Sequence, residues 1–330
     1  MSSVNRPIQL GLCCMNITLR DRRPPIYCSR TITMKMINRL GIEEAKRRGL
    51  ANAQDLTRLI QWNEDNGIKV LRVSSDLFPH YANPRVESYD LKFAAPALEE
   101  AGALARKYNM RITFHPGQYN VVGTPNESVL AKTILDLTYQ ATVLNMMGMG
   151  VNSVMVVHGG GLYGDKKAAM DRWCRNFLKL PECVRRRLVL ECCERIFSIE
   201  DCLEISERIN IPVVFDTHHF DCYKILHPEE RFCEAEYYIP LILKTWERRG
   251  IKPKFHVSEQ GSGKTGHHSD YIENLPDYLL EIPEKYGVDI DIMIEAKKKE
   301  FAIFRLYEKY PELNCKPRRI KCKVKKTEGK

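Results

Sequence analysis

Two stretches of the sequence decide the fold: RLVLECCERI at residues 187–196 and PVVFDTHHF at residues 212–220. In each, a short apolar run that is typical of a buried strand ends at an acidic residue, Glu191 in the first and Asp216 in the second. A charged side chain directly after a buried strand is costly to desolvate unless it is paired or bound to a cation. The two stretches therefore predict buried strands whose ends meet at a polar site.

The same pattern occurs at four further places along the chain. Apolar runs lead directly into His115, His158, His256 and Glu295. In a β/α barrel the C-terminal ends of successive parallel strands converge on one mouth, where such proteins place their chemistry. We therefore interpret these four residues and the two acidic residues above as parts of one site.

Short apolar runs alternate with longer amphipathic segments along the whole chain. Strands are predicted at residues 8–15, 69–75, 111–114, 153–157, 187–190, 212–215, 254–257 and 289–294. Helices are predicted at residues 33–48, 52–67, 93–108, 127–147, 165–179, 199–209 and 235–249, and from about residues 270 and 300 onward. Eight strand-then-helix units favour an α/β fold that closes into a TIM-type (β/α)8 barrel, forming a single domain over residues 1–314. An open doubly wound sheet is the alternative.

The composition is that of a globular protein, with 44% hydrophobic and 28% charged residues. No apolar run approaches the ~20 residues that a membrane helix needs, so we expect no membrane partner. The N-terminus lacks the basic-then-apolar pattern of a signal peptide. We therefore expect an intracellular location, in the cytoplasm, nucleoid or nucleus, where the 12 cysteines stay reduced.

Most of the net charge of +9 lies at the C-terminal end. Residues 315–330 contain eight Lys or Arg residues against one Glu and show no apolar periodicity. This segment is predicted to be a basic, disordered tail. Its charge suits a phosphate backbone, and a nuclear-targeting or a solubilising role fits equally well.

Eight of the nine histidines lie at predicted strand ends or in the loops just after them. They are His80, His115, His158, His218, His219, His256, His267 and His268. Any one of them alone is better explained as a hydrogen-bonded structural residue. Their repeated placement beside Glu191, Asp216 and Glu295 instead favours a site for two or three divalent ions, because imidazole and carboxylate ligands suit Mn²⁺ or Zn²⁺ and the candidate ligands exceed what one ion can use. Clustered ions of this kind are typical of phosphodiester cleavage.

Seven motifs at separate strand ends carry a resemblance to a known family. In chain order they are SSDLFPH, TFHPGQY, VVHGGG, LVLECCE, FDTHH, KFHVSEQ and MIEAKKKE. They resemble the UV damage endonucleases, which are related to abasic-site nucleases of the endonuclease IV type, over about residues 9–306, with the basic tail outside. The resemblance implies a TIM barrel with up to three metal ions, usually manganese. It also implies an enzyme that nicks DNA immediately 5′ of a UV photoproduct or another distorting lesion.

The resemblance also implies how the metal ligands divide among three ions. The sets are His115, His158 and Glu191; Glu191, Asp216, His256 and Glu295; and His219 with His268. His218 and His267 are the neighbouring alternatives to the last pair. Lys254 stands where the endonuclease IV relatives have a metal-binding Asp, and in the UV damage enzymes this lysine can be carboxylated. Unmodified, Lys254 would repel metal ions or stabilise phosphate charge. Together with Glu191 and His256, it is a predicted catalytic residue.

Four residues match positions near the DNA in the family. Gln118 and Tyr119 match a pair that probes the duplex at the lesion, and Asn16 and His80 match positions near the substrate. An amide and an aromatic ring can fill the space left by unstacked bases, although without the motif a loop-packing Tyr119 would be the simpler interpretation. Leu12 stands where some members have Tyr, which leaves one stacking contact in doubt. The expected partner is damaged double-stranded DNA, bound by a monomer.

Three rival functions fit part of this pattern. An abasic-site endonuclease would share the fold and metals, but Lys254 and the Gln118–Tyr119 pair count against it. A metal-dependent sugar isomerase on the same barrel would have a small closed pocket and no affinity for DNA. A nucleic-acid-binding module without catalysis would bind DNA and never nick it.

Overall fold

Eight parallel strands form the centre of the computed structural model, which describes residues 6–316. They are β1 (Ile8–Cys13), β2 (Val70–Val73), β3 (Arg111–Phe114), β4 (Met155–His158), β5 (Leu188–Glu191), β6 (Val213–Val214), β7 (Lys254–Val257) and β8 (Ile290–Ile294). Hydrogen-bonded neighbours follow the order β6-β5-β4-β3-β2-β1-β8-β7. All of the pairings are parallel, as strand-helix-strand connections require.

The two ends of this sheet meet through a single pair of residues. Asp216, just after β6, forms a parallel bridge with His256 in β7, and the backbone N–H of His256 donates to the carbonyl of Phe215 over 3.0 Å. The sheet thereby closes, and the predicted TIM-type barrel is confirmed. Every strand end that carries a predicted ligand consequently opens on the same mouth.

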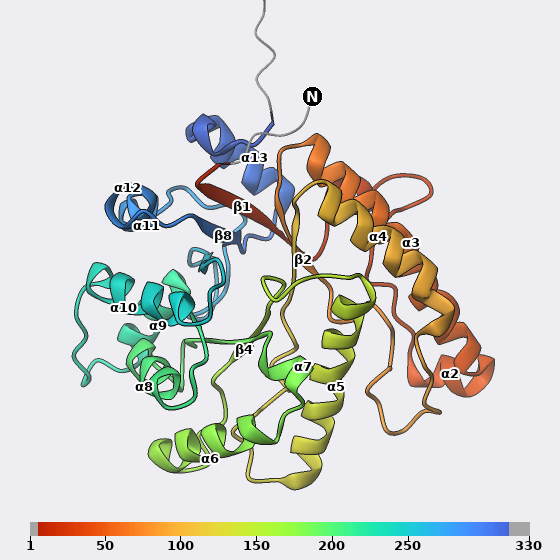
Figure 1. Cartoon of the computed structure of the whole chain (residues 1–330), viewed down its shortest axis with the longest axis horizontal. Helices are drawn as coiled ribbons and strands as arrows, with labels where there is room; N and C mark the ends of the chain where they lie inside the picture. The colour runs from red at the N-terminus through yellow and green to blue at the C-terminus, as the bar shows by residue number, and fades with distance from the viewer. Residues whose placement is uncertain (1–5, 317–330) are drawn as a thin grey trace, which may run out of the picture.

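Helices surround the strands, as Figure 1 shows. They are α1 (Ile17–Arg20), α2 (Met34–Leu40), α3 (Ile42–Asp65), α4 (Ala95–Lys107), α5 (Glu127–Met146), α6 (Lys166–Lys179), α7 (Glu182–Arg185), α8 (Ile199–Ile209), α9 (Thr217–Leu226), α10 (Ala235–Glu247), α11 (Asp277–Leu280), α12 (Ile282–Tyr286) and α13 (Glu300–Lys309), with 3-10 turns η1 (Lys92–Ala94) and η2 (Pro311–Leu313). Within residues 6–316, none of the helices combines the length and the apolar character needed to cross a membrane.

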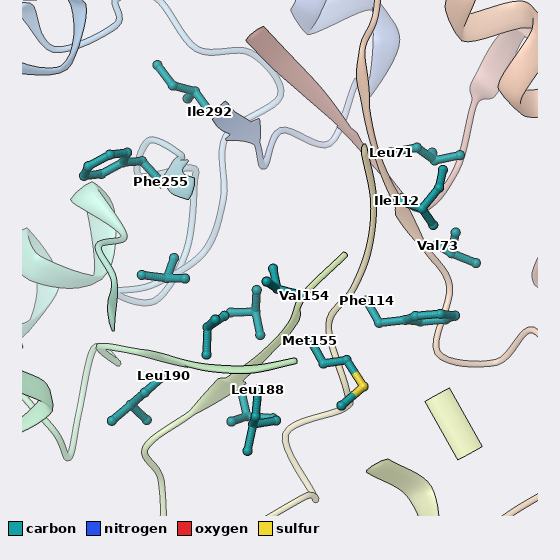
Figure 2. Close-up of a cluster of buried hydrophobic side chains, with 14 of the residues drawn as sticks. Leu71, Val73, Ile112, Phe114, Val154, Met155, Leu188, Leu190, Phe255 and Ile292 are labelled. Carbon is teal, nitrogen blue, oxygen red and sulfur yellow. The ribbon is translucent and has the colours of Figure 1, made fainter. Parts of the chain in front are cut away.

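Alternate strand residues fill two different environments. One set, which includes Leu71, Ile112 and Phe255 (Figure 2), joins the hydrophobic core. This core also contains the apolar faces of the helices. The other set lies inside the barrel and contains charged residues, among them Arg111 and Asp291. This division follows from the twofold alternation of side chains along a strand.

Ion pairs neutralise several of the buried charges inside the barrel. Asp291 in β8 lies 2.7 Å from Arg111 and 2.6 Å from Lys252, and four residues further along the chain Glu295 pairs with Arg72. A buried charge without such a partner would cost several kcal/mol, on the order of 3–5. These ion pairs extend from the barrel interior to the mouth, where Glu295 lies.

The predicted boundary between the first two helices is wrong. We expected a break between residues 48 and 52, whereas the helices separate at Gly41, which has a φ of 80°. Gly49 lies inside α3, and a Cβ at that position would come within 2.5 Å of the Phe78 ring. Gly49 therefore serves close packing, while Gly41 supplies the left-handed backbone that ends α2.

The helix predicted from residue 270 is also wrong. The chain has no helix between residue 270 and Asp277, where α11 begins directly after Pro276. Pro283 lies in the first turn of α12, which is also short. Proline favours a helix start and disfavours helical backbone in the residue before it. One helix that is present was not predicted. It is α9, which begins shortly after β6 and has Asp216 as the cap of its first turn.

The C-terminal segment is described only as far as residue 316. Cys315 is buried, and residues 317–330, which hold most of the predicted basic tail, lie outside the described residues. The cysteines within residues 6–316 are free thiols.

Candidate metal centre

Glu191 lies at the middle of the barrel mouth, at the end of β5. Its Oε2 atom is 2.8 Å from Nε2 of His115 and 3.6 Å from Nε2 of His158, and its Oε1 atom is 2.6 Å from Nδ1 of His256. Both carboxylate oxygens are thus turned toward imidazole rings that come from other strands or from the loops that follow them. The side chain is fully buried.

Two groups of potential metal ligands share this carboxylate. The first group is His115, Glu191, His256 and Glu295, and the second is His158, Glu191 and His219. Within each group, one ligand atom from every residue lies within 4.8 Å of the others. Glu191 therefore belongs to both groups, so its carboxylate could contribute to a clustered metal site.

Asp216 adds a further oxygen next to the second group. Its Oδ1 accepts a 2.8 Å hydrogen bond from the backbone of His219, while Oδ2 is buried without a hydrogen-bond partner and lies 3.7 Å from Nδ1 of His219. A buried carboxylate oxygen without a donor is costly. A bound cation would satisfy it, so the residues present fit a metal centre.

The alternative histidines lie in different surroundings. Nδ1 of His219 is 3.8 Å from Glu191, whereas the ring of His218 packs against the thiol of Cys222. Nδ1 of His268 is 3.9 Å from Oε2 of Glu295, whereas His267 is exposed. Distances to the carboxylates thus favour His219 and His268. In the structure His219 groups with His158 and Glu191, rather than with His268.

The histidines hold the shared carboxylate in its ionised form. Burial alone would raise the pKa of Glu191, but His256, His158 and His115 hold the pKa well below its usual range. Burial would likewise raise the pKa of Glu295, and Arg72 is the main cause of its being lowered instead. Burial dominates at Asp216 and raises its pKa to about 7. Two of the three acidic groups are therefore charged and ready to bind cations at neutral pH.

Burial also changes the pKa values of the histidines at the site. The pKa of His256 falls to about 4 because of burial and the nearby Lys254, and burial lowers the pKa of His158 to about 4. Burial would lower the pKa of His219, but Asp216 and Glu191 raise it to about 9. His256 and His158 are thus neutral imidazoles near pH 7, the form in which histidine binds metals.

Lys254 lies inside the barrel, next to His256 of the first ligand group. It is fully buried, and its Nζ atom is 2.7 Å from Nε2 of His256. Burial, reinforced by the positive charges of Arg72 and Arg111, lowers the pKa of Lys254 to about 8.

The predicted DNA contacts lie at the rim of the mouth. Asn16 caps α1, since its Oδ1 accepts from the backbone of Leu19 over 2.7 Å, and its Nδ2 is buried without a partner. His80 has a φ of 60° and its Nε2 lies 2.6 Å from the carbonyl of Ile32. Leu12 is fully buried in the hydrophobic core, so this position does not present a side chain to the mouth.

Gln118 and Tyr119 are exposed on a turn after β3. The Tyr119 side chain keeps 65% of its surface accessible. It borders a cavity of about 510 Å³ that is also lined by His80, Asn120 and Asp136. The exposed part of the ring is therefore available to a ligand.

Sequence reasoning missed Arg72. Arg72 pairs with Glu295, and its Nε lies 3.3 Å from Sγ of Cys14. An arginine in the middle of the short buried strand VLRV was an available signal. Arg20 and Arg23 line a second cavity of about 360 Å³ in the loop after β1, and neither has an ion-pair partner among the described residues.

A family model described as UV-endonuclease UvdE matches residues 8–325. The chain belongs to the UV-endonuclease family. The sequence motifs placed this likeness between residues 9 and 306, with the basic tail outside; the family match is longer and includes most of that tail. The predicted family is confirmed.

Relatives of this UV-endonuclease family member span bacteria and fungi. The chain is 38% identical over 312 residues to the UV-damage endonuclease of Schizosaccharomyces pombe, covering 92% of this chain and 50% of that protein. It is 34% identical over 311 residues to the UV DNA damage endonuclease of Bacillus velezensis, covering 91% of this chain and 93% of the relative.

Solved structures agree on the fold. The crystal structure of SacUVDE is 28% identical, with a TM-score of 0.79 over 94% of this chain and all of that chain. Endonuclease IV from Thermus thermophilus has a TM-score of 0.55 at 13% identity, over 92% of this chain and 99% of that one. At that identity the second likeness concerns the barrel alone.

Proposed function

We propose that the chain is a metal-dependent DNA repair endonuclease that nicks DNA immediately 5′ of UV photoproducts and other distorting lesions, leaving 3′-OH and 5′-phosphate ends. The observation that carries this proposal is the position of Glu191, which belongs to two ligand groups at the mouth of a UV-endonuclease barrel. Such a shared carboxylate suits a cluster of divalent ions. The substrate is damaged double-stranded DNA, and the chain acts as a monomer.

Two to three divalent ions, Mn²⁺ or else Zn²⁺, would be held by side chains from the strand ends and the loops that adjoin them. The proposed ligands are His115, His158, Glu191, Asp216, His219, His256, His268 and Glu295. When bound, such ions lower the pKa of water and neutralise the charge that develops on the leaving 3′ oxygen. The contribution of the chain is to orient these ligands and to keep Glu191 ionised among its histidines.

Lys254 acts in this centre as a neutral or carboxylated side chain. Nδ1 of His256 faces Glu191 at 2.6 Å and Glu295 at 3.2 Å, so this nitrogen is the one available to a cation. The ring proton then resides on Nε2, 2.7 Å from Nζ of Lys254. An ammonium group has no acceptor to offer that proton, whereas a neutral amine or a carbamate does. A carbamate would also supply a negative charge.

Gln118 and Tyr119 would enter the duplex at the lesion. The exposed ring can stack on a base, a contact worth ~1–3 kcal/mol. A damaged step is already weakly stacked, so bending the DNA there costs less than at an intact step. Discrimination between damaged and intact DNA would therefore arise at this turn, and cleavage at the metal centre.

Arg20 and Arg23 would bind the phosphate backbone beside the site. Both are exposed, line the same cavity and lack carboxylate partners among residues 6–316. Glu300 fixes the start of this segment by accepting from the backbone N–H groups of Ile17 and Thr18. Contacts of this kind are independent of sequence and weaken as the salt concentration rises.

Two rivals share the barrel, an abasic-site endonuclease and a metal-dependent sugar isomerase. The exposed Tyr119 and the buried Lys254 favour the UV-lesion enzyme over the first, and the unpaired arginines at the rim favour it over the second. Activity on both kinds of damaged DNA would be compatible with this site.

One assay separates these functions. Purified protein is incubated with duplexes that carry a single UV photoproduct, a single abasic site or no damage, with chelator and after Mn²⁺ is added back, and the cut is mapped. We expect a chelator-sensitive nick 5′ of the photoproduct. Cleavage of the abasic duplex alone would support the first rival. Binding without any nick would support a non-catalytic module, and undiminished nicking in chelator would refute the metal role.

A further inference from the structure

The Gln118–Tyr119 pair sits at the tip of a turn that Asn120 closes. The backbone N–H and the side-chain Nδ2 of Asn120 both donate to the carbonyl of Gly117, over 2.9 and 3.0 Å. A Cβ added to Gly117 would lie 2.5 Å from the Tyr119 ring, so the ring rests directly on this glycine. The turn thus presents an exposed aromatic ring from a tightly bonded base.

A buried carboxylate ties this turn to the barrel. Nδ2 of Asn120 also donates to Oδ2 of Asp136 in α5 over 2.7 Å, and Nε2 of Gln140 donates to the same oxygen over 3.0 Å. Asn120, Asp136 and Gln140 are 5%, 7% and 0% exposed. The turn is therefore anchored at its last residue to a helix of the scaffold.

The charge on Asp136 has no cationic partner among the described residues. Burial raises its pKa to about 6, which reflects the cost of holding the charge there. An asparagine could accept the same two hydrogen bonds without this cost. A carboxylate at this position does, however, make the bond to Asn120 charge-assisted and therefore stronger and shorter than a neutral one.

The anchor and the metal centre are held separately. His115 precedes the turn, with only Pro116 between it and Gly117, but its ring is fixed by the 2.8 Å contact with Glu191. The recorded hydrogen bonds of Asp136 go to Asn120 and Gln140, and none of them involves a predicted metal ligand. Loosening the anchor should consequently move Tyr119 without moving the ligands.

We propose that Asp136, acting through Asn120, is a positioning residue that fixes the Gln118–Tyr119 turn for insertion into DNA, so that it determines lesion recognition rather than the rate of strand cleavage. This inference rests on the proposed nicking of damaged DNA. Loss of the anchor lets the turn sample other conformations, and the duplex then binds only to the fraction that is correctly placed.

Two substitutions at one position separate positioning from charge. Asp136→Leu has a similar shape but removes the acceptor, and Asp136→Asn retains it. On a duplex with a single photoproduct, we expect Asp136→Leu to raise KM about tenfold with kcat within about twofold of wild type. Asp136→Asn should restore KM to within about threefold. A 2-aminopurine beside the lesion reports base unstacking directly, and its fluorescence rise on binding should be lost with Leu and recovered with Asn.

Asn176→Ala is the matched control. Asn176 is also buried and holds the same loop, since its Nδ2 donates to the carbonyls of Val122 and Thr124 over 2.8 and 3.0 Å. None of its recorded hydrogen bonds involves the turn at residues 117–120. We expect it to lower the melting temperature and leave KM and the fluorescence rise unchanged. If Asp136→Leu does not fold, Asn120→Ala tests the same anchor from the other side.

The outcomes distinguish this inference from the proposed function. If the wild-type protein does not nick the lesion duplex, the proposed function fails. If the wild type nicks but Asp136→Leu and Asn120→Ala keep the wild-type KM and fluorescence rise, the positioning role is refuted. A fall in kcat alone, or a KM change that Asn176→Ala reproduces, would also refute it.

Discussion

Nζ of Lys254 lies 2.7 Å from Nε2 of His256, with both side chains fully buried inside the barrel. This contact determines which imidazole nitrogen faces the barrel mouth, because Nδ1 is left directed at Glu191 and Glu295. A lysine in such a place can serve as a ligand-orienting amine or, after carboxylation, as an anion. The two states are chemically distinguishable.

We expect Lys254 to be carboxylated in the metal-loaded protein. A carbamate accepts the proton on Nε2 of His256 and adds negative charge beside the cations, which an ammonium group would repel. After incubation with ¹³C-labelled bicarbonate and the diamagnetic ion Zn²⁺ in place of Mn²⁺, the ¹³C NMR spectrum should contain a carbamate signal that is absent from Lys254→Met. Metal-loaded, active wild-type protein without that signal would show that the neutral amine suffices.

We expect Glu191→Gln to reduce nicking by at least about a hundredfold while the protein stays folded, because an amide cannot bridge two cations as a carboxylate does. Nicking and bound metal would be measured together, with circular dichroism as the test of folding. Glu229→Gln is the matched control, since Glu229 is an exposed carboxylate outside the two ligand groups that contain Glu191. Wild-type turnover in Glu191→Gln would remove this residue from the mechanism.

Arg72→Leu should destabilise the metal-free protein more than the metal-loaded protein. Removing one partner of a buried ion pair leaves Glu295 without a positive neighbour at that carboxylate oxygen, which costs ~3–5 kcal/mol. A bound cation would replace the lost charge. Melting temperatures of both proteins with chelator and with Mn²⁺ test this, and an equal loss under the two conditions would contradict it.

Asp136 should make stability fall as the pH rises. Burial raises its folded-state pKa from the ordinary 3.8 to about 6, so the folded protein binds this proton more tightly than the unfolded chain does. The stabilisation is therefore complete below about pH 4 and is lost as the pH rises through about 6. Asp76 contributes in the same direction, and the amides of Asn120 and Gln140 oppose it.

Asp136→Asn should accordingly raise the free energy of unfolding at pH 8 by up to about 3 kcal/mol and have little effect near pH 4. Urea unfolding at both pH values provides the measurement. Lys132 also lines the cavity beside Asp136, and Lys132→Gln at pH 8 shows whether a nearby surface charge accounts for the effect. Equal unfolding free energies of wild type and Asp136→Asn at pH 8 would refute the buried-charge argument.

The barrel and the set of residues that meet at its mouth could be predicted because both depend on local patterns. An apolar run of four residues that ends in His or Glu contains the strand, its direction and the ligand together, as in the run that ends at Glu191. Helix boundaries were less predictable, because either Gly41 or Gly49 could end a helix, and only the folded structure shows that Gly41 does so. The Phe78 ring that makes Gly49 a packing residue is remote in sequence.

The contacts between strands could not be predicted from the sequence. Arg72 and Glu295 are 223 residues apart and meet only because β1 pairs with both β2 and β8. The same is true of Asn120 and Asp136, whose contact depends on how α5 packs against the loop after β3. Local patterns identify the polar residues at the strand ends, and the closed sheet determines which of them meet.

The bridge between Asp216 and His256 joins the first and last strands of the sheet order, and both residues are proposed ligands. The proposed metal site and the closure of the barrel therefore depend on the same two positions. A substitution that improved the chemistry at either one would also alter the seam that keeps β6 beside β7. Amide hydrogens along that seam should exchange more slowly once cations bind, whereas the exchange rates of amide hydrogens between β1 and β2 should not change.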